Sequence, residues 1–374
     1  MDTPVAKKDH LRILFLTIDE SATLVNLKNY ICAETDTELD YMLFGLPRSK
    51  NSKTIQDIYF VTSTGNIIDK SISFNISFKE PLRSLFKFIM HCYAFFILFK
   101  IIKHKKYDIC IAETSNLGML AWILKKTGKC RMTVFFAGDI YATDIKGVVG
   151  SFLIFSQKLL RKVSYKNNLI WYINRRLKKW DRDHGFMAKD SFIGGIFSFD
   201  NKKVIKYSKY LKNMQQICYI GRIDQHAGLD IVIRSIKYIR KKIPNITFKV
   251  IGGYSENDLL YFKELAKREE VSERVQFLGF IKDIKEVEDI IAESALGMAV
   301  YDPHKESGTF YIDPGKVRDY LEAGTPVVIT KQGPLVIRDI RKYNAGILVE
   351  FDPFDIADKI IEVFNLTEFI TWAN

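Results

Sequence analysis

Several features are scarce in this sequence of 374 residues, and each scarcity excludes a class of protein. The five cysteines stand singly, without a Cys-x-x-Cys pair or a neighbouring histidine cluster that would hold zinc. Low-complexity tracts and collagen-like repeats are absent as well. The spacing therefore excludes a disulfide-rich secreted scaffold and a zinc module, and it favours a reduced compartment.

Long hydrophobic runs are also missing, since a bilayer crossing takes roughly 18 to 20 apolar residues. The longest candidate, FIMHCYAFFILF, lies between Lys87 and Lys100 and is followed by further lysines. It is either a buried helix of an α/β domain or a helix in the membrane interface whose basic end meets anionic headgroups. The early run LRILFLTI is too short for a signal-peptide core and predicts a first strand.

Charge is the least balanced property, with a net +12. Residues 1–195 hold 30 Lys+Arg and 18 Asp+Glu, whereas residues 196–374 hold 26 of each, so the first half carries the whole excess. No nucleic-acid-binding motif is present, and the basic residues are not interleaved with aromatics on one short element. We therefore expect no nucleic-acid partner, and we expect an anionic membrane surface to meet segments 86–106 and 158–179.

Short apolar, β-branched runs alternate with helical patterns along most of the chain. Strands are predicted at 11–18, 40–45, 58–63, 107–113, 131–137, 168–173, 216–221, 247–253, 274–280, 295–301, 326–330 and 346–350. The alternation stops in a polar stretch after residue 194, which we take as the linker. The pattern predicts an α/β protein of two doubly wound, Rossmann-like domains, 1–195 and 196–374, with ligands in a cleft at the carboxyl ends of the strands.

The first strand of the second domain ends in Gly221 and Arg222, and a helix opens after Gly228. Backbone N–H groups and the helix dipole favour an anion at such a place. Arg222 would add a charge-assisted contact. The same residues also fit a loop with a solvated cation.

The segment 311–328 carries the stronger constellation. Asp313 is a predicted N-cap, Pro314 the predicted first helical residue, and Gly324 the predicted end of the helix. Lys316 then lies in the first turn, where the helix dipole disfavours a cation unless an anion is bound. Asp319 shares its face and is placed to accept hydrogen bonds from a ribose diol, the alternative being a Lys316–Asp319 surface pair.

Three motifs in the second half occur in the order typical of one family: Gly221-Arg222, Gly252-Gly253 and Gly324-Thr325-Pro326-Val327-Val328. Residues 215 to about 362 thereby resemble the nucleotide-sugar-binding domain of GT-B glycosyltransferases of the group typified by family 4. The resemblance implies that residues 1–195 bind the acceptor. It also implies a UDP- or GDP-sugar as substrate, with no cofactor and no bound metal.

Three positions depart from the family pattern. Ala227 stands where a lysine usually grips the diphosphate, and Tyr311 and Asp319 stand where two glutamates are usual. The run Pro314-Gly315-Lys316 is similar to a GT-B branch in which a lysine of this helix binds the diphosphate. We therefore infer that Lys316 replaces the absent lysine. The resemblance leaves the donor sugar open, and also whether its anomeric configuration is inverted or retained.

Other donor-side candidates follow neighbouring predicted strands. Glu306 lies in a long loop before the Lys316 helix and could meet donor-sugar hydroxyls, unless it is a solvated loop acid. Tyr311 is counted with the donor residues because of its position in the family pattern. The resemblance places base and ribose at Gly253 and at Ile281, which could also be simple turns.

In the first half, a carboxylate at a strand end could take the proton of an acceptor hydroxyl. Asp139 is the first choice, supported by the resemblance, and it could instead cap the next turn. Glu113, with Ser115 and Asn116, ends the preceding strand and is the second choice. The triplet Asp181-Arg182-Asp183 superficially resembles a metal motif, but it follows a helical pattern, so no metal site is predicted.

The sequence thus predicts a glycosyltransferase, hexosyltransferase-like, that moves a sugar to a lipid-linked or membrane-associated saccharide in polysaccharide or glycoconjugate biosynthesis. We expect it in the cytoplasm, peripheral at the inner face of the cell membrane. A non-catalytic binding or scaffold subunit of the same fold, motivated by Ala227 and Tyr311, and a nucleotide-sugar epimerase are the alternatives. GT-B proteins usually continue beyond the last predicted helix, 354–364, with a helix that crosses back to the first domain.

Overall fold

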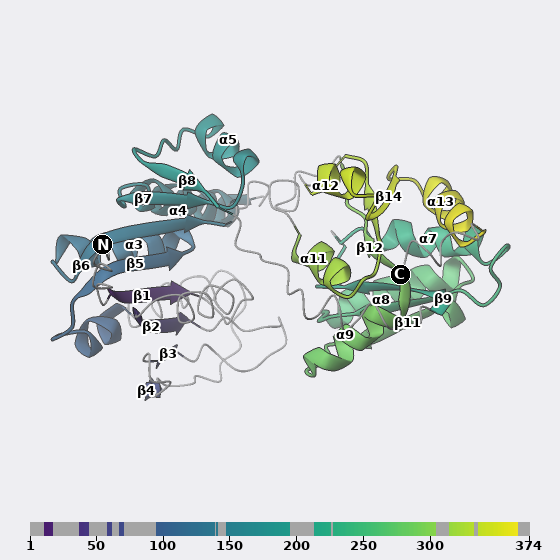
Figure 1. Ribbon diagram of the computed structural model, residues 1–374, viewed down its shortest axis with the longest axis horizontal. Coiled ribbons are helices and arrows are strands. Elements are labelled where there is room, and N and C mark those ends of the chain that lie inside the picture. Colours follow the sequence, from purple (N-terminus) through teal and green to yellow (C-terminus); the bar gives the residue numbers. More distant parts are fainter. Residues whose placement is uncertain are drawn as a thin grey trace, which may run out of the picture. The chain divides into compact units, whose positions relative to one another are not determined.

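The chain divides into two compact units. The computed structural model describes residues 11–17, 37–44, 58–61, 67–70, 95–138, 140, 147–194, 213–225, 227–303, 314–332 and 336–365. The N-terminal unit comprises Met1–Arg48 with Ser52–Ser198, and the C-terminal unit comprises Ser49–Asn51 with Phe199–Asn374. The boundary predicted between residues 195 and 196 lies outside the described residues. Figure 1 shows a central sheet with helices in each unit.

The N-terminal unit contains an eight-stranded sheet in the order β4-β3-β2-β1-β5-β6-β7-β8. Its strands are β1 (Leu11–Thr17), β2 (Thr37–Phe44), β3 (Ile58–Val61), β4 (Ile67–Lys70), β5 (Tyr107–Glu113), β6 (Cys130–Ala137), β7 (Leu169–Tyr172) and β8 (Ser191–Ile193). The neighbouring pairs β2-β1, β1-β5, β5-β6, β6-β7 and β7-β8 are all parallel. The six strands predicted for this half are confirmed.

One edge of this sheet differs from the prediction. β3 runs antiparallel to β2, and β4, which was not predicted, runs antiparallel to β3. Only residues 62–66 separate β3 from β4, too few for the crossover that a parallel pair needs, so the second strand must return beside the first. An antiparallel edge on an otherwise parallel sheet is common in such domains. The short β8 was also missed.

The C-terminal unit is a six-stranded, fully parallel sheet in the order β11-β10-β9-β12-β13-β14. Its strands are β9 (Asn213–Ile220), β10 (Thr247–Ile251), β11 (Val275–Gly279), β12 (Ser294–Ala299), β13 (Val327–Thr330) and β14 (Gly346–Val349). All six were predicted. Counted from its first strand, the order is 3-2-1-4-5-6, the doubly wound order whose direction of winding reverses between β9 and β12.

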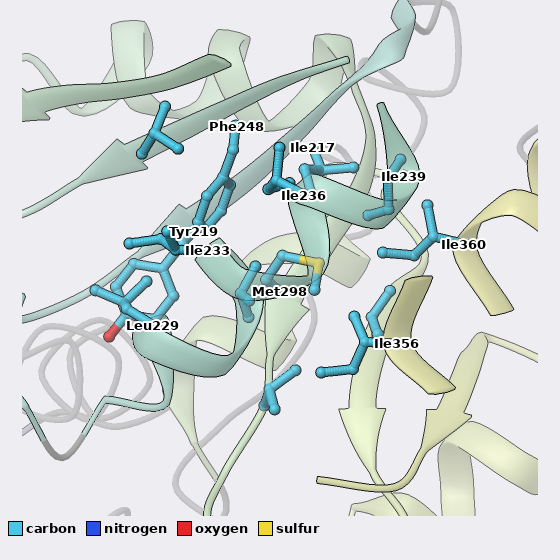
Figure 2. Packing of buried hydrophobic residues seen from close by; sticks show 14 of the residues in the cluster. Ile217, Tyr219, Leu229, Ile233, Ile236, Ile239, Phe248, Met298, Ile356 and Ile360 are labelled. Carbon is cyan, nitrogen blue, oxygen red and sulfur yellow. The ribbon is translucent and has the colours of Figure 1, made fainter. Parts of the chain in front are cut away.

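Both faces of this sheet are covered, as a parallel sheet requires. The helices are α7 (Leu229–Ile239), α8 (Glu256–Arg268), α9 (Ile284–Glu293), α11 (Gly315–Glu322), α12 (Ile337–Lys342) and α13 (Pro353–Asn365). Ile217 and Tyr219 of β9 point to the core that α7, α8 and α13 close, part of which Figure 2 shows. Cys218 and Ile220 point to the other core, beneath α9, α11 and α12. Alternate side chains of β9 therefore pack into two separate cores, one on each face of the sheet.

The N-terminal unit contributes α3 (Ser115–Lys126), α4 (Gly147–Ser164) and α5 (Arg175–Asp183), and residues 95–101 are also helical. Leu98 and Ile102 are fully buried against β1, β5 and α3, with Phe95 and Phe99 packed beside them. The described part of the apolar run, 95–99, is therefore a helix with Ile97 and Leu98 buried and Phe96 67% exposed. Among the described residues, no helix has the length and apolar character needed to cross a membrane.

A buried ion pair fixes α5 to α4. The Arg161 guanidinium donates from Nε to Asp181 Oδ1 at 2.6 Å and from a terminal nitrogen to Oδ2 at 2.8 Å, and Asp181 is fully buried. The Tyr165 hydroxyl donates to the same carboxylate and is 2.8 Å from the hydroxyl of Tyr172. Asp181 therefore has a structural role, and the Asp-Arg-Asp triplet is divided between core and surface.

We expect Asp181→Ala to destabilise the N-terminal unit by about 3–5 kcal/mol, because it leaves a buried guanidinium unpaired. Urea unfolding followed by tryptophan fluorescence measures this, since Trp180 lies beside the pair. Asp183→Ala is the matched control, because the Asp183 side chain is 52% exposed. Equal losses in the two variants would contradict a structural role for the buried pair.

Candidate functional site

Three neighbouring strands of the C-terminal sheet end in glycine at the same edge. Gly221, Gly252 and Gly279 follow or end β9, β10 and β11, with φ values of 133°, 148° and 73°. A Cβ built on Gly252 would lie 1.7 Å from the carbonyl oxygen of Gly221, so no side chain fits there. A Cβ on Gly253 would meet nothing within 4 Å. The two strand ends thus pack backbone to backbone and leave open space beside Gly253.

Lys316 of α11 reaches this edge from the far side of the winding reversal. Its Nζ lies 3.8 Å from the centre of the Tyr219 ring and 5.7 Å from that of Tyr301. A Cβ built on Gly221 would lie 3.2 Å from the same Nζ. The structure therefore brings two predicted donor residues, Gly221 and Lys316, into contact at the point where doubly wound sheets bind their ligands.

The Lys316 ammonium lacks a full set of partners. It forms no hydrogen bond or ion pair with any residue in the described ranges. Burial lowers the pKa of Lys316 from 10.5 to about 7, and the charge of Asp224 opposes only part of that shift. The nearby Tyr301 hydroxyl is also buried without a partner in the described part of the chain. A cation with unused donors, held against aromatic faces, is suited to receive an anion.

Tyr320, four residues after Lys316 on the same face of α11, holds the helix in place. Its hydroxyl accepts from the Ile220 N–H at 3.0 Å and donates to the Met298 carbonyl at 3.1 Å, which links α11 to β9 and β12. A Cβ on Gly297 would lie 2.4 Å from the Tyr320 ring, so only glycine lets the ring lie on β12. Sequence reasoning missed both residues, although a glycine inside the strand ALGMAV marks a close approach.

The ends of α11 partly match the prediction. The helix begins at Gly315 with Pro314 as its N-cap, one residue later than predicted, and no side chain caps it. Asp313, the predicted N-cap, lies outside the described residues. At the other end, the Thr325 N–H donates to Tyr320 O at 2.8 Å and the Gly324 N–H to Leu321 O at 3.0 Å. These two bonds confirm the predicted glycine stop.

Two further charged candidates lie at this end of the unit. Arg222 is exposed, its Nε lies 3.2 Å from Asp224 Oδ2, and its carbonyl accepts a hydrogen bond from the Tyr219 hydroxyl. Asp319 accepts from Arg318 at 2.9 Å, so the Lys316–Asp319 surface pair is not formed. The Asp319 side chain is still 38% exposed. Both groups therefore remain accessible to a ligand.

The remaining donor-side candidates are less informative. Ile281, after β11, is partly buried and packs against the core beneath α9 and α11. The Ile223 N–H donates to the Gly253 carbonyl at 3.0 Å, which ties the loops after β9 and β10 together. Glu306 and Tyr311 lie outside the described residues.

On the N-terminal sheet, the winding reverses between β1 and β5. Glu113, at the end of β5, accepts a hydrogen bond from Thr17 at the end of β1. Ser115 begins α3, its carbonyl accepts from the Ser164 hydroxyl at 2.6 Å, and Asn116 follows it. Asp139 lies outside the described residues. Among the residues described, no group of three or more His, Cys, Asp or Glu could hold a metal ion.

Tyr320→Phe should lower the free energy of unfolding of the C-terminal unit by about 1–3 kcal/mol, because the Ile220 N–H and the Met298 carbonyl lose their buried partner. Chemical denaturation measures the change. Tyr343→Phe removes a hydroxyl from a side chain that is 67% exposed and should change stability by less than about 0.5 kcal/mol. A loss no larger than that of the control would contradict the anchoring role of Tyr320.

Lys316→Met should stabilise the folded protein, and the gain should depend on pH. Because the pKa is 10.5 in a free lysine and about 7 in the fold, the unfolded chain binds the proton more tightly between these values. Wild-type stability therefore rises across that window, and the penalty is full below pH 7. We expect a gain of about 4–5 kcal/mol at pH 6.5, whose pH-dependent part vanishes near pH 10.5. A gain that stays constant across the window would contradict the lowered pKa.

Comparison with known proteins finds one family model that matches the C-terminal unit. Residues 214–365 match the model of the family described as glycosyl transferases group 1. An uncharacterized glycosyltransferase of Methanocaldococcus jannaschii is 23% identical over 232 residues, which cover 58% of this chain and 55% of the relative. The match thus spans little more than half the length of that curated relative.

Solved structures match across both units. HepE of Anabaena, in complex with UDP-glucose, has a TM-score of 0.64 at 15% identity, covering 97% of this chain and 93% of that one. Sucrose-phosphate synthase of Thermosynechococcus elongatus has a TM-score of 0.63 at 12% identity, covering 97% and 91%. The predicted GT-B fold of two Rossmann-like domains is confirmed. Residues 214–365 therefore match the glycosyl transferases group 1 model, and the solved structures add the fold of both units.

Proposed function

We propose that the protein is a glycosyltransferase that moves a sugar from a nucleotide-diphosphate sugar to a lipid-linked or otherwise membrane-associated saccharide. The proposal places this activity in polysaccharide or glycoconjugate biosynthesis, at the cytoplasmic face of the cell membrane. The observation that carries it is the partly unsatisfied Lys316 ammonium at the glycine-rich edge of a group 1 glycosyltransferase domain. The curated match spans about half of its relative, so the activity of the whole chain is itself proposed.

The reaction requires charge stabilisation at the leaving group. The bond between the anomeric carbon and the diphosphate oxygen breaks, the acceptor oxygen bonds to that carbon, and the acceptor hydroxyl proton must leave. In our proposal Lys316 and Arg222 hold the diphosphate and stabilise the charge that develops on it. Asp139 accepts the acceptor proton. Lys316 then supplies the cation that a lysine at position 227 supplies in the usual family pattern.

The rest of the donor fits around these two cations. Asp319 would accept hydrogen bonds from the ribose diol, and Gly253 and Ile281 would border the base and ribose. Glu306 and Tyr311 would meet the sugar, while Glu113, Ser115 and Asn116 would lie on the acceptor side. We propose UDP as the first nucleotide to test, because the Anabaena structure holds UDP-glucose. The proposal includes no metal and no cofactor.

Lys316→Ala should weaken binding of UDP by about 10- to 100-fold, since it removes one charge-assisted contact worth about 1.5–3 kcal/mol. Isothermal calorimetry at pH 8 in two buffers of different ionisation enthalpy also counts protons. The wild type should take up protons on binding, because its lysine has a pKa of about 7 before the anion arrives, and the variant should not.

The matched control is Lys263→Ala, at an exposed position of α8. It should bind UDP as the wild type does. Unchanged affinity and turnover in Lys316→Ala would refute the role of Lys316. Transfer by the purified chain from a UDP-sugar to an acceptor separates the proposal from a scaffold subunit, and conversion of the donor without an acceptor would indicate an epimerase.

A further inference from the structure

Helix α4 exposes a stripe of large apolar side chains. Phe152, Phe155 and Leu159 are 68%, 64% and 53% exposed. Their spacing of three and four residues places them on one face of the helix. Large apolar groups gathered on one exposed face indicate an interaction surface more often than scattered ones do.

Exposed lysines continue the same stripe. Lys162 follows Leu159 at a spacing of three, and Lys158 lies beside it. Lys166 follows in the turn after α4 ends at Ser164. None of these three lysines forms an ion pair within the described residues. The Lys166 Nζ lies 5.2 Å from the centre of the Trp122 ring, and this contact with an uncharged ring leaves the positive charge of the lysine in place. From Phe152 to Lys162 the stripe is about 15 Å long, with an apolar first half and a cationic second half that Lys166 extends.

The opposite face of α4 is fixed, so the stripe is not the result of a loosely packed helix. Arg161 and Ser164 are buried, the first by its ion pair with Asp181 and the second by its hydrogen bond to the Ser115 carbonyl. A Cβ built on Gly118 of α3 would lie 2.7 Å from the Ser164 hydroxyl oxygen, which shows how closely the two helices approach. This packing holds the stripe outward.

We propose that this face of α4 docks on an anionic lipid bilayer. Phe152, Phe155 and Leu159 enter the boundary between headgroups and acyl chains, and the three lysines contact lipid phosphates. A helix of this pattern lies in the interface plane, and cations near an anionic leaflet are attracted to it. A second protein surface would need carboxylates to match the lysines, whereas an anionic bilayer offers both the charge and the apolar layer. The positive excess of the same half of the chain acts in the same direction.

The inference deepens the proposed function and rests on it for the membrane-associated acceptor. Flotation with vesicles contains neither donor nor acceptor, so docking and transfer can fail independently. The full-length protein is mixed with phosphatidylcholine vesicles that contain or lack 30% phosphatidylglycerol, at low and at high salt, and vesicle-bound protein is measured. We expect wild-type binding to the anionic vesicles at low salt, with less binding at high salt and on neutral vesicles.

Two triple variants test the two halves of the stripe. Phe152→Ser/Phe155→Ser/Leu159→Ser should reduce partition at least about tenfold, and Lys158→Glu/Lys162→Glu/Lys166→Glu should reduce it about a hundredfold or more. The matched controls change exposed residues of the C-terminal unit: Leu260→Ser/Phe280→Ser/Ile284→Ser and Lys263→Glu/Lys267→Glu/Lys285→Glu. Because all substituted side chains are exposed, melting temperatures should match the wild type and both controls should float normally.

Three results would overturn the proposal. The first is a wild type that does not float with anionic vesicles, and the second is a stripe variant that floats as well as its control. The third is a wild-type dimer, seen by sedimentation equilibrium, that the serine variant abolishes while flotation is unchanged, because a second copy would then cover the stripe.

Discussion

The Tyr320 hydroxyl, bonded between Ile220 of β9 and Met298 of β12, fixes the geometry on which the candidate site depends. Those two strands flank the reversal of winding, where the chain leaves an opening beyond the strand ends. By linking α11 to both strands, Tyr320 sets the height of the helix over the sheet. Lys316, one turn earlier, thereby has its Nζ beside Gly221 and over the Tyr219 ring, so the helix positions this cation at the strand end.

The same anchoring creates an electrostatic conflict that a ligand would resolve. The first turn of a helix carries partial positive charge, and Lys316 adds a further cation there. The aromatic faces of Tyr219 and Tyr301 attract the ammonium and offset part of this repulsion. The site is buried, however, so water no longer solvates the ammonium. The net result is a lowered pKa. A diphosphate would satisfy the helix end and the lysine together, which is a reason for such an arrangement to persist despite its cost to stability.

Sequence reasoning located this conflict but not its cause. The twelve predicted strands are present because apolar, β-branched runs between helical patterns have few other solutions. Lys316 was identified because it breaks a local rule, and local rules are visible in sequence. Tyr320, Gly297 and the direction of β3 were missed because they depend on contacts between distant segments. Asp139, Glu306 and Tyr311 remain predictions, since they lie outside the described residues.

The exposed face of α4, which we propose docks on a bilayer, shows how little hydropathy alone reveals about exposure. The sequence left the run 88–99 open between a buried and an interfacial helix, and the structure buries its Leu98 and exposes its Phe96. The less apolar α4 exposes Phe152 and Phe155. Composition gives the hydrophobicity of a helix, but tertiary packing decides which of its faces is buried. In α4 the charged Arg161 is buried because it forms an ion pair with Asp181. The side of α4 that carries Arg161 is therefore buried, and the side that carries Phe152 and Phe155 is exposed. In our proposal the positive excess of the N-terminal half attracts the anionic bilayer, and this role is separate from that of Lys316 at the proposed donor site.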